Sequence, residues 1–168
     1  MERFWNIIHY CAYKGDYKMH LLFNNINPVV LLLRITFIKK FYSKKGVDVE
    51  SNLNTAFRLP DVGLSSIRVG GFMYGLVFFF QLGIIEFFLG ITMIKPHGFF
   101  FIIIPPFVIS IIINNMLLFK NDKYLKYFQE FDKMGTSFKR RWSWISFGII
   151  IGILMFLIIG FIFMDYRV

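Results

Sequence analysis

Three long apolar runs constrain the fold of this chain more than any other feature of its sequence. They cover residues 69–94, 98–119 and 142–164. A helix needs about 20 mainly apolar residues to cross a hydrocarbon core about 30 Å thick, and each run reaches that length. Charged residues make up only 17% of the chain, well below their share in ordinary soluble domains. The sequence therefore predicts an all-α integral membrane protein, a small helical bundle with three transmembrane helices.

The connections between these runs predict how the spans are arranged. A turn at residues 95–98 separates the first two runs, so residues 69–119 are expected to form an antiparallel transmembrane hairpin. The third transmembrane helix and a short outside tail cover residues 142–168. This helix follows three consecutive basic residues and begins with Trp142, a pattern typical of an anchor at the membrane interface.

Basic residues are distributed unevenly around the spans. Residues 1–68 contain ten Lys or Arg and residues 120–141 contain seven, whereas the turn and the C-terminal tail contain one each. Because basic loops stay on the cytosolic side, we expect both rich segments, and the N-terminus, in the cytosol and the C-terminus outside. The formal net charge of +9 then belongs to loops that meet anionic lipid headgroups, and no nucleic-acid recognition motif accompanies it. The predicted location is the inner membrane, with a multi-pass topology.

The region before the first span is expected to form three segments. Residues 1–19 predict an amphipathic helix that lies in the membrane interface or packs on the cytosolic ends of the bundle. Residues 20–42 are apolar but interrupted. A helix that starts at Pro28 and ends near Lys40 is too short to span, so this segment forms either a re-entrant or interfacial helix or a fourth, broken span. Residues 43–68 are a polar cytosolic connection. On a helical projection, the first segment has Phe4, Trp5, Ile7, Ile8, Cys11 and Ala12 on one side and Glu2, Arg3, Asn6, His9 and Tyr10 on the other.

The basic loop at residues 120–141 contains a second amphipathic segment. Asn121 is a suitable N-cap for a helix, and Gly135 is a suitable end for it. This helix is expected to lie on the membrane or to form a protein contact. Its broad apolar face contains Tyr124, Leu125, Tyr127, Phe128, Phe131 and Met134.

Polar side chains within the apolar segments are the candidates for function, because hydrocarbon offers them no hydrogen-bond partner. In the spans they are Gln81, Glu86, Asn114 and Asn115. The two asparagines are expected near the cytosolic end of their helix, within reach of water or headgroups. Glu86 is deeper, and a helical projection turns it toward the bundle and turns Gln81 away. We expect its carboxyl to be protonated and to donate a hydrogen bond, or to pair with Arg34. A structural hydrogen bond and a role in proton or ion passage both remain open.

Glycines recur at matching spacing in the first and third spans. Small residues let membrane helices approach closely, so the two stripes are expected to face each other or another subunit. In the middle span, Pro105 and Pro106 each remove a backbone donor, which predicts a kink or a break. The stripes consist of Gly71, Gly75, Gly83 and Gly90 in the first span and Gly148, Gly152 and Gly160 in the third.

The sequence lacks the residue patterns of common catalytic and metal sites. The three histidines lack zinc spacing, Cys11 is the single cysteine, and no phosphate-binding loop or close carboxylate pair is present. No cofactor is expected, and the chain is predicted not to be an enzyme. We expect a small membrane protein that acts through protein contacts or self-association, as an accessory or immunity-type subunit. The alternative is a homo-oligomeric pore of the holin type, which would need a continuous polar face on one helix.

Overall fold

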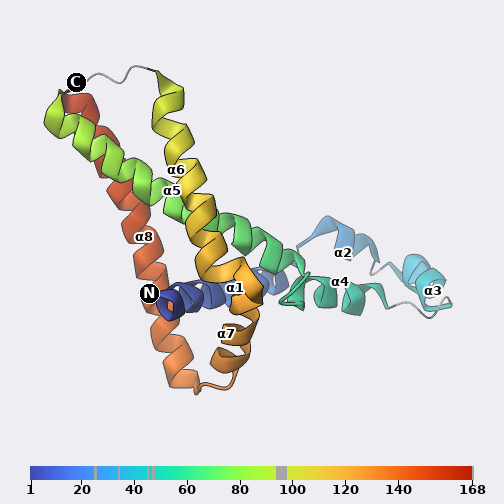
Figure 1. Ribbon diagram of the computed structural model, residues 1–168. Helices are drawn as coiled ribbons and strands as arrows, with labels where there is room; N and C mark the ends of the chain where they lie inside the picture. Colours follow the sequence, from blue (N-terminus) through green and yellow to red (C-terminus); the bar gives the residue numbers. More distant parts are fainter. Residues whose placement is uncertain (25, 34, 45, 47, 94–97, 168) are drawn as a thin grey trace. The chain divides into compact units, whose positions relative to one another are not determined.

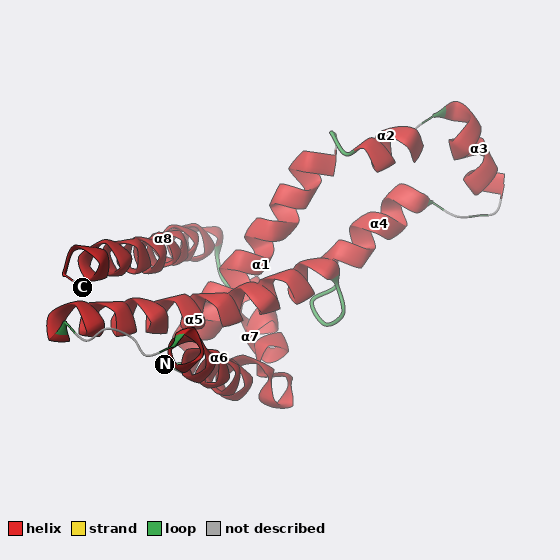
Figure 2. Cartoon of the chain, turned by 90° about the horizontal axis from the view of Figure 1, so that it is seen from above, coloured by secondary structure: helices red, strands yellow, loops and turns green. Residues whose placement is uncertain are grey.

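The computed structural model describes residues 1–24, 26–33, 35–44, 46, 48–93 and 98–167. All regular structure in these residues is helical, with no strand (Figure 2). Three helical stretches are long and apolar enough to cross a membrane, namely Leu64–Thr92, Ile102–Asp132 and Thr136–Tyr166. The predicted all-α fold with three long apolar helices is confirmed.

The chain forms two compact units. Unit 1 consists of Met1–Cys11 and Gly70–Val168, and unit 2 consists of Ala12–Val69. Two helices contribute to both units, α1 (Glu2–Asn24) and α5 (Leu64–Thr92). The other two spanning helices, α6 (Phe99–Asn114) and α8 (Thr136–Arg167), belong wholly to unit 1 (Figure 1).

Helices α5 and α6 pack antiparallel, as the sequence predicts. The Ser110 hydroxyl donates a hydrogen bond to the Tyr74 carbonyl oxygen at 2.8 Å, and Gln81 Nε2 donates to the Pro106 carbonyl oxygen at 3.4 Å. Later residues of α5 therefore face earlier residues of α6. The predicted turn between the two helices lies almost entirely outside the described residues.

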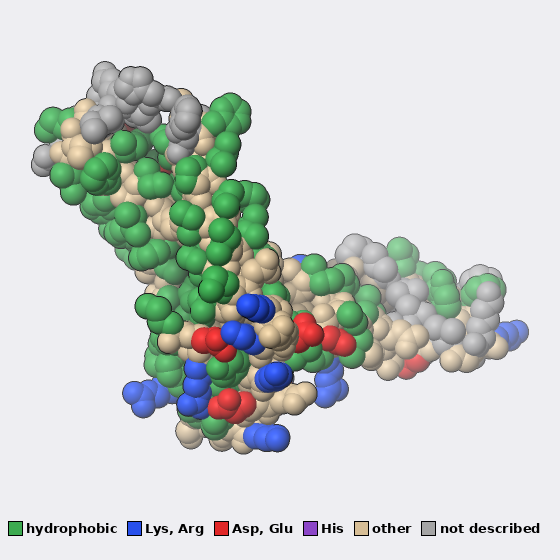
Figure 3. All heavy atoms as spheres, viewed as in Figure 1, with side chains coloured by type: hydrophobic (Ala, Val, Ile, Leu, Met, Phe, Trp, Pro, Cys, Tyr) green, Lys and Arg blue, Asp and Glu red, His purple; other side chains and the backbone are tan. Residues whose placement is uncertain are grey.

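Helices α5 and α8 run in the same direction and meet in their C-terminal halves. The Phe87 ring on α5 stacks on Phe156 and Phe163 of α8, with ring centroids 5.0 and 5.4 Å apart. Apolar side chains cover the visible face of α5, α6 and α8, and charged side chains of unit 1 gather where α1 and α7 (Lys123–Asp132) lie (Figure 3). Helices that are apolar on all sides are suited to a lipid environment.

The two prolines do not break α6. The helix continues through Pro105 and Pro106 to Asn114, so a break is excluded, whereas the alternative of a kink stays a prediction. Its winding changes further on, where a π-helical turn, Asn115–Phe119, precedes a short 3-10 turn, Lys120–Asp122.

The predicted N-cap of the loop helix is also wrong. Asn121 and Asp122 both have positive φ, 59° and 51°, and α7 begins only at Lys123. Asparagine and aspartate tolerate the left-handed conformation better than other residues with a Cβ. The chain uses them to turn out of the π-helix, so neither side chain caps α7.

The N-terminal helix packs on the bundle, which is one of the two predicted alternatives. Helix α1 continues past the predicted end at residue 19 to Asn24. The projection assigned Asn6, His9 and Tyr10 to the outer side, but these three side chains are buried in the structure. The assignment is wrong because the opposing surface is aromatic and offers hydrogen-bond acceptors, which accommodate this polar side.

Unit 2 contains the remainder of α1, then α2 (Pro28–Leu33), α3 (Thr36–Lys44), α4 (Val49–Arg58) and the start of α5. A helix begins at Pro28 as predicted, but two helices occupy the range in which one was expected. Asp16 and Arg68 form an ion pair of 2.7 Å, and the Tyr13 hydroxyl donates to the Arg58 carbonyl oxygen. These contacts close the unit by joining α1 to the end of α4 and the start of α5. None of its helices before α5 is among the candidate spans found in the described residues.

Candidate functional site

Asn114 is the centre of a hydrogen-bonded cluster in unit 1. Its side chain is fully buried, and Nδ2 donates to the carbonyl oxygens of Met73 at 3.3 Å and Ser110 at 3.0 Å. Its Oδ1 accepts a hydrogen bond from Trp5 Nε1 at 3.0 Å. Asn114 thus joins α1, α5 and α6 and lies out of reach of water, which corrects the expectation for this residue. Asn115 is exposed.

His9 lies in an aromatic cage next to this cluster. Its side chain is 0% exposed, with the rings of Phe119, Tyr124 and Phe128 at centroid distances of 6.1, 5.5 and 5.1 Å. Neither ring nitrogen has a hydrogen-bond partner among the described residues. Burial disfavours the charged imidazolium and lowers the pKa of His9 to about 4. The imidazole is therefore neutral at pH 7.

Two ion pairs join the start of α1 to the segment that follows α6. Glu2 pairs with Lys123 and Arg3 pairs with Glu130, each at 2.7 Å. The hydrogen bond from Lys123 lowers the pKa of Glu2. Exposed pairs of this kind contribute little to stability, but their positions place the N-terminus beside the segment that follows α6. This agrees with the charge distribution, which predicts both segments on one side of the membrane.

Sequence reasoning missed the N-terminal docking surface formed by Asn6, His9 and Tyr10. The three residues share a helix face by their spacing, and Asn6 Nδ2 donates to the Leu117 carbonyl oxygen at 2.9 Å. The Tyr10 hydroxyl donates to Asp132 at 2.7 Å. The sequence did contain a signal for this contact. The apolar face predicted for residues 120–141 needed another surface to pack against, and the N-terminal helix supplies it.

Cys11 follows this surface. It is a free, partly buried thiol, and burial raises its pKa. A thiol in this state is a weak nucleophile.

Glu86 lies in the contact between α5 and α8. Its side chain is 4% exposed, and Oε2 has no hydrogen-bond partner among the described residues. A Cβ added at Gly160 would lie 3.1 Å from this oxygen and 3.2 Å from the carbonyl oxygen of Gly83. Glu86 thus faces α8, as the projection predicts. Gln81 donates to the Pro106 carbonyl oxygen of α6, so the expectation that it points away from the bundle is wrong. Arg34 lies outside the described residues, so its pairing with Glu86 stays a prediction.

The glycine stripes meet over only half of their length. A Cβ at Gly83 would lie 2.7 Å from the Phe156 ring, and one at Gly90 would lie 2.6 Å from the Phe163 ring. For the remaining glycines an added Cβ would meet nothing within 4 Å on another helix, so they do not face each other within the chain, and their contact with another subunit stays a prediction. Toward that end α1 occupies the space, with the Phe4 ring 6.0 Å from Trp142 of α8. The residues without such contacts are Gly71, Gly75, Gly148 and Gly152.

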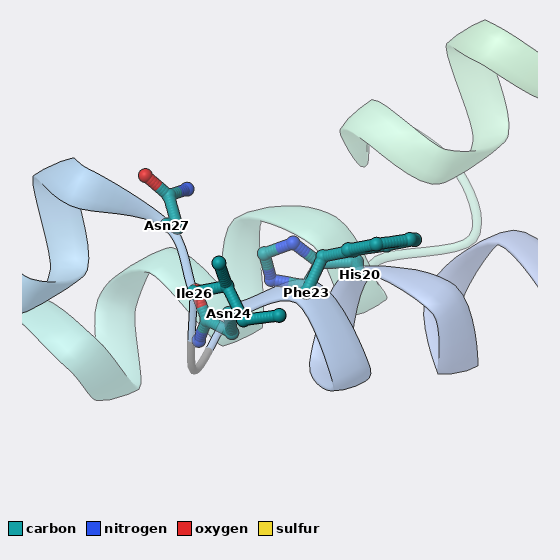
Figure 4. A pocket seen from close by; sticks show the side chains of 5 residues that line it. All are labelled: His20, Phe23, Asn24, Ile26 and Asn27. Atoms are coloured by element: carbon teal, nitrogen blue, oxygen red, sulfur yellow. The ribbon is translucent and has the colours of Figure 1, made fainter.

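A shallow pocket of about 280 Å³ lies at the corner between α1 and α2 in unit 2 (Figure 4). Its lining includes Phe23 and Ile26, which are 59% and 72% exposed. Asn24 Nδ2 donates to Asn54 Oδ1 at 3.2 Å, but Asn24 Oδ1 has no partner among the described residues. The same holds for Nε2 of His20, whose ring stacks on Phe57 at 3.6 Å. The pocket therefore combines an apolar rim with two buried, unused polar atoms.

No protein-family model, curated protein or solved structure matches this chain.

The geometry of these sites limits the chemistry that each of them can perform. The described residues contain no cluster of three His, Cys, Asp or Glu side chains that could hold a metal ion. Aromatic rings surround His9, and Glu86 lies against the α8 backbone at Gly160. The N-terminal docking surface holds unit 1 together, the pocket can accept a side chain from another molecule, and Glu86 can bind a proton.

Proposed function

We propose that this chain is a non-enzymatic inner-membrane protein that binds another protein through unit 2, as an accessory or immunity-type subunit. The observation that carries the proposal is the pocket at Phe23, Asn24 and Ile26 together with the apolar surface around it. Three long apolar helices support a multi-pass membrane location for the rest of the chain.

The apolar surface of unit 2 is large for helices that are not among the candidate membrane spans. Patches of this kind mark sites that bind a protein or a membrane surface. The apolar side chains that form this surface of unit 2 are each at least 37% exposed; they are Met19, Leu21, Leu22, Phe23, Ile26, Leu31, Leu32, Ile35, Phe41 and Tyr42.

The polar atoms of the pocket favour a protein over lipid as the occupant. Asn24 Oδ1 and His20 Nε2 are already buried without partners, and each unsatisfied buried group costs several kcal/mol. An occupant that donates hydrogen bonds can recover this cost when the pocket wall shifts to admit it, whereas hydrocarbon cannot. A protein side chain or backbone can donate to Asn24. Residues 12–69 contain nine Lys or Arg against four Asp or Glu, so the expected partner surface is apolar with an acidic rim.

The orientation supports a cytosolic partner surface. Residues 1–68 contain ten of the 19 basic residues, which favours the cytosolic side for unit 2. The partner is then a soluble protein or the cytosolic part of another membrane protein.

The alternative, a homo-oligomeric pore, needs a continuous polar helix face. Glu86 faces α8, Gln81 donates to the Pro106 carbonyl oxygen of α6, and Asn114 is enclosed by α1 and α5. These side chains point to different neighbours within one chain, so they supply no common polar lining.

The test is site-specific photo-crosslinking in intact cells, with the crosslinker at Ile26. A matched position at Asn52, an exposed polar residue of α4, serves as the control. We expect one protein to crosslink from Ile26 but not from Asn52. The purified pair should then bind in mild detergent, at least tenfold more weakly after Phe23→Asp and equally well after Asn52→Asp.

Three results would contradict the proposal. They are crosslinking from Ile26 to lipid alone, crosslinking to a second copy in a ring-sized particle, and unchanged affinity after Phe23→Asp. The first would assign the surface to the membrane, and the second would support the pore.

A further inference from the structure

We propose that Glu86 is a proton-binding site whose bound proton keeps the C-terminal halves of α5 and α8 together. This inference concerns unit 1 and does not depend on the partner surface of unit 2. The ligand is a hydrogen ion, and the site is the Glu86 carboxyl, whose Oε2 lies against the α8 backbone at Gly160.

The enclosure leaves Glu86 Oε2 without solvent or protein partners. The oxygen is buried and has no hydrogen-bond partner among the described residues. The position of a Cβ at Gly160, 3.1 Å from this oxygen, shows that the α8 backbone passes directly over the carboxyl. Phe156 and Phe163, which come before and after Gly160 on α8, both stack on Phe87 of α5, so ring contacts flank the Glu86–Gly160 contact along the helix axis. Water can reach Oε2 only if the two helices separate.

No described neighbour supplies a compensating positive charge. Between residues 69 and 92 of α5, Tyr74 is the other ionisable residue, and α6 has none between residues 99 and 114. On α8 there is none between residues 143 and 164, and the next one, Asp165, is itself acidic and exposed. Arg34, Lys95 and His97 lie outside the described residues.

An ionised Glu86 in this contact would be a buried, unpaired charge, which is strongly unfavourable. The carboxylate avoids it by taking a proton from water, which forms an O–H bond on the carboxyl and leaves hydroxide, or water when hydronium is the donor. The reverse step returns the proton to water and restores the charge. Because Oε2 has no room for a hydrating water against Gly160, ionisation should open the contact at this point. The C-terminal halves of α5 and α8 thus form a contact, called the α5–α8 joint below, that is closed when Glu86 is protonated and open when Glu86 is ionised.

The first experiment measures the joint directly in lipid nanodiscs. Phe88 and Ile159, which are 59% and 50% exposed, are replaced by spin-labelled cysteines in a Cys11→Ser background. We expect the distance distribution to move to longer values between pH 6 and pH 9.5. In the matched Glu86→Gln variant, which keeps the shape but cannot ionise, the distribution should stay at its pH 6 position. A distribution that does not change with pH, or that changes equally in Glu86→Gln, would overturn the proposal.

The second experiment needs no change at Glu86 and so remains valid if that variant fails to fold. The infrared carbonyl band of a protonated carboxyl is recorded on the unmodified protein at both pH values, with Asp165→Asn as the control for the nearest exposed acid. We expect the band at pH 6, its loss at pH 9.5 and no change in the control. Absence of the band at pH 6 would show that Glu86 is ionised, for example by pairing with Arg34, and would refute proton binding.

Discussion

Acidification should release the N-terminal helix through His9. In the docked state the imidazole is fully buried against Phe128 and its pKa is lowered to about 4. When α1 detaches, His9 meets water and regains the ordinary histidine pKa of about 6.5. Between these two values the detached state binds more protons than the docked state. The stability of the docked helix is therefore fully present above about pH 6.5 and is lost as the pH falls toward 4.

The size of the effect follows from the two pKa values. A shift from 6.5 to about 4 corresponds to about 3 kcal/mol when the pH is below both values. At pH 5 the detached state is almost fully protonated and the docked state almost fully neutral, so the loss relative to pH 8 is about 2 kcal/mol. This equals roughly a 30-fold larger population of the detached helix. The hydrogen bond from Lys123 lowers the pKa of the neighbouring Glu2 carboxyl.

Hydrogen–deuterium exchange of the α1 amides measures this population, after correction for the intrinsic effect of pH on exchange. The matched control is His9→Phe, which retains an aromatic ring in the cage but cannot be protonated. We expect protection of α1 to fall roughly 30-fold from pH 8 to pH 5 in the natural protein and to change little in the variant. Equal pH dependence in both proteins, or none in the natural one, would refute the reasoning.

Three further predictions concern unit 1 and its orientation. Asn114→Ala should lower the stability in detergent by roughly 2–3 kcal/mol because it removes the buried hydrogen bonds to the Met73 and Ser110 carbonyl oxygens and the acceptor of the half-buried Trp5 indole N–H, whereas the exposed Asn115→Ala should change it by less than about 0.5 kcal/mol. Gly160→Leu should destabilise by at least about 1–3 kcal/mol through overpacking, and Gly152→Leu should be nearly neutral; equal effects in thermal unfolding would contradict the observed packing. A cysteine at Tyr166 in a cysteine-free background should react with an impermeant thiol reagent added outside the cell, and its protection would reverse the proposed orientation.

The spanning helices could be predicted from the sequence because the requirements of a lipid environment apply to each helix by itself. Hydrocarbon requires a minimum length and an apolar surface of every span, whatever the neighbouring helices do. The facing of Glu86 toward α8 followed from the local periodicity, since a helix fixes which residues share a face. The winding of the chain after α6 could not be predicted in this way. At Asn121 the local preference for an N-cap competed with the left-handed conformation, and the turn out of the π-helix required the latter.

The sequence by itself determined the number of long apolar helices, their antiparallel and parallel relations and the distribution of charge around them. These properties depend on residues close together in the chain. Only the tertiary structure decided that Asn6 and His9 face inward, and that Gly83, Gly90 and Gly160 make the close contacts while Gly75 and Gly152 do not. The reason is that close packing depends on both surfaces at once. A polar helix face is buried only where its partner offers acceptors and rings, and a glycine matters only where another backbone or ring occupies the space of its missing side chain.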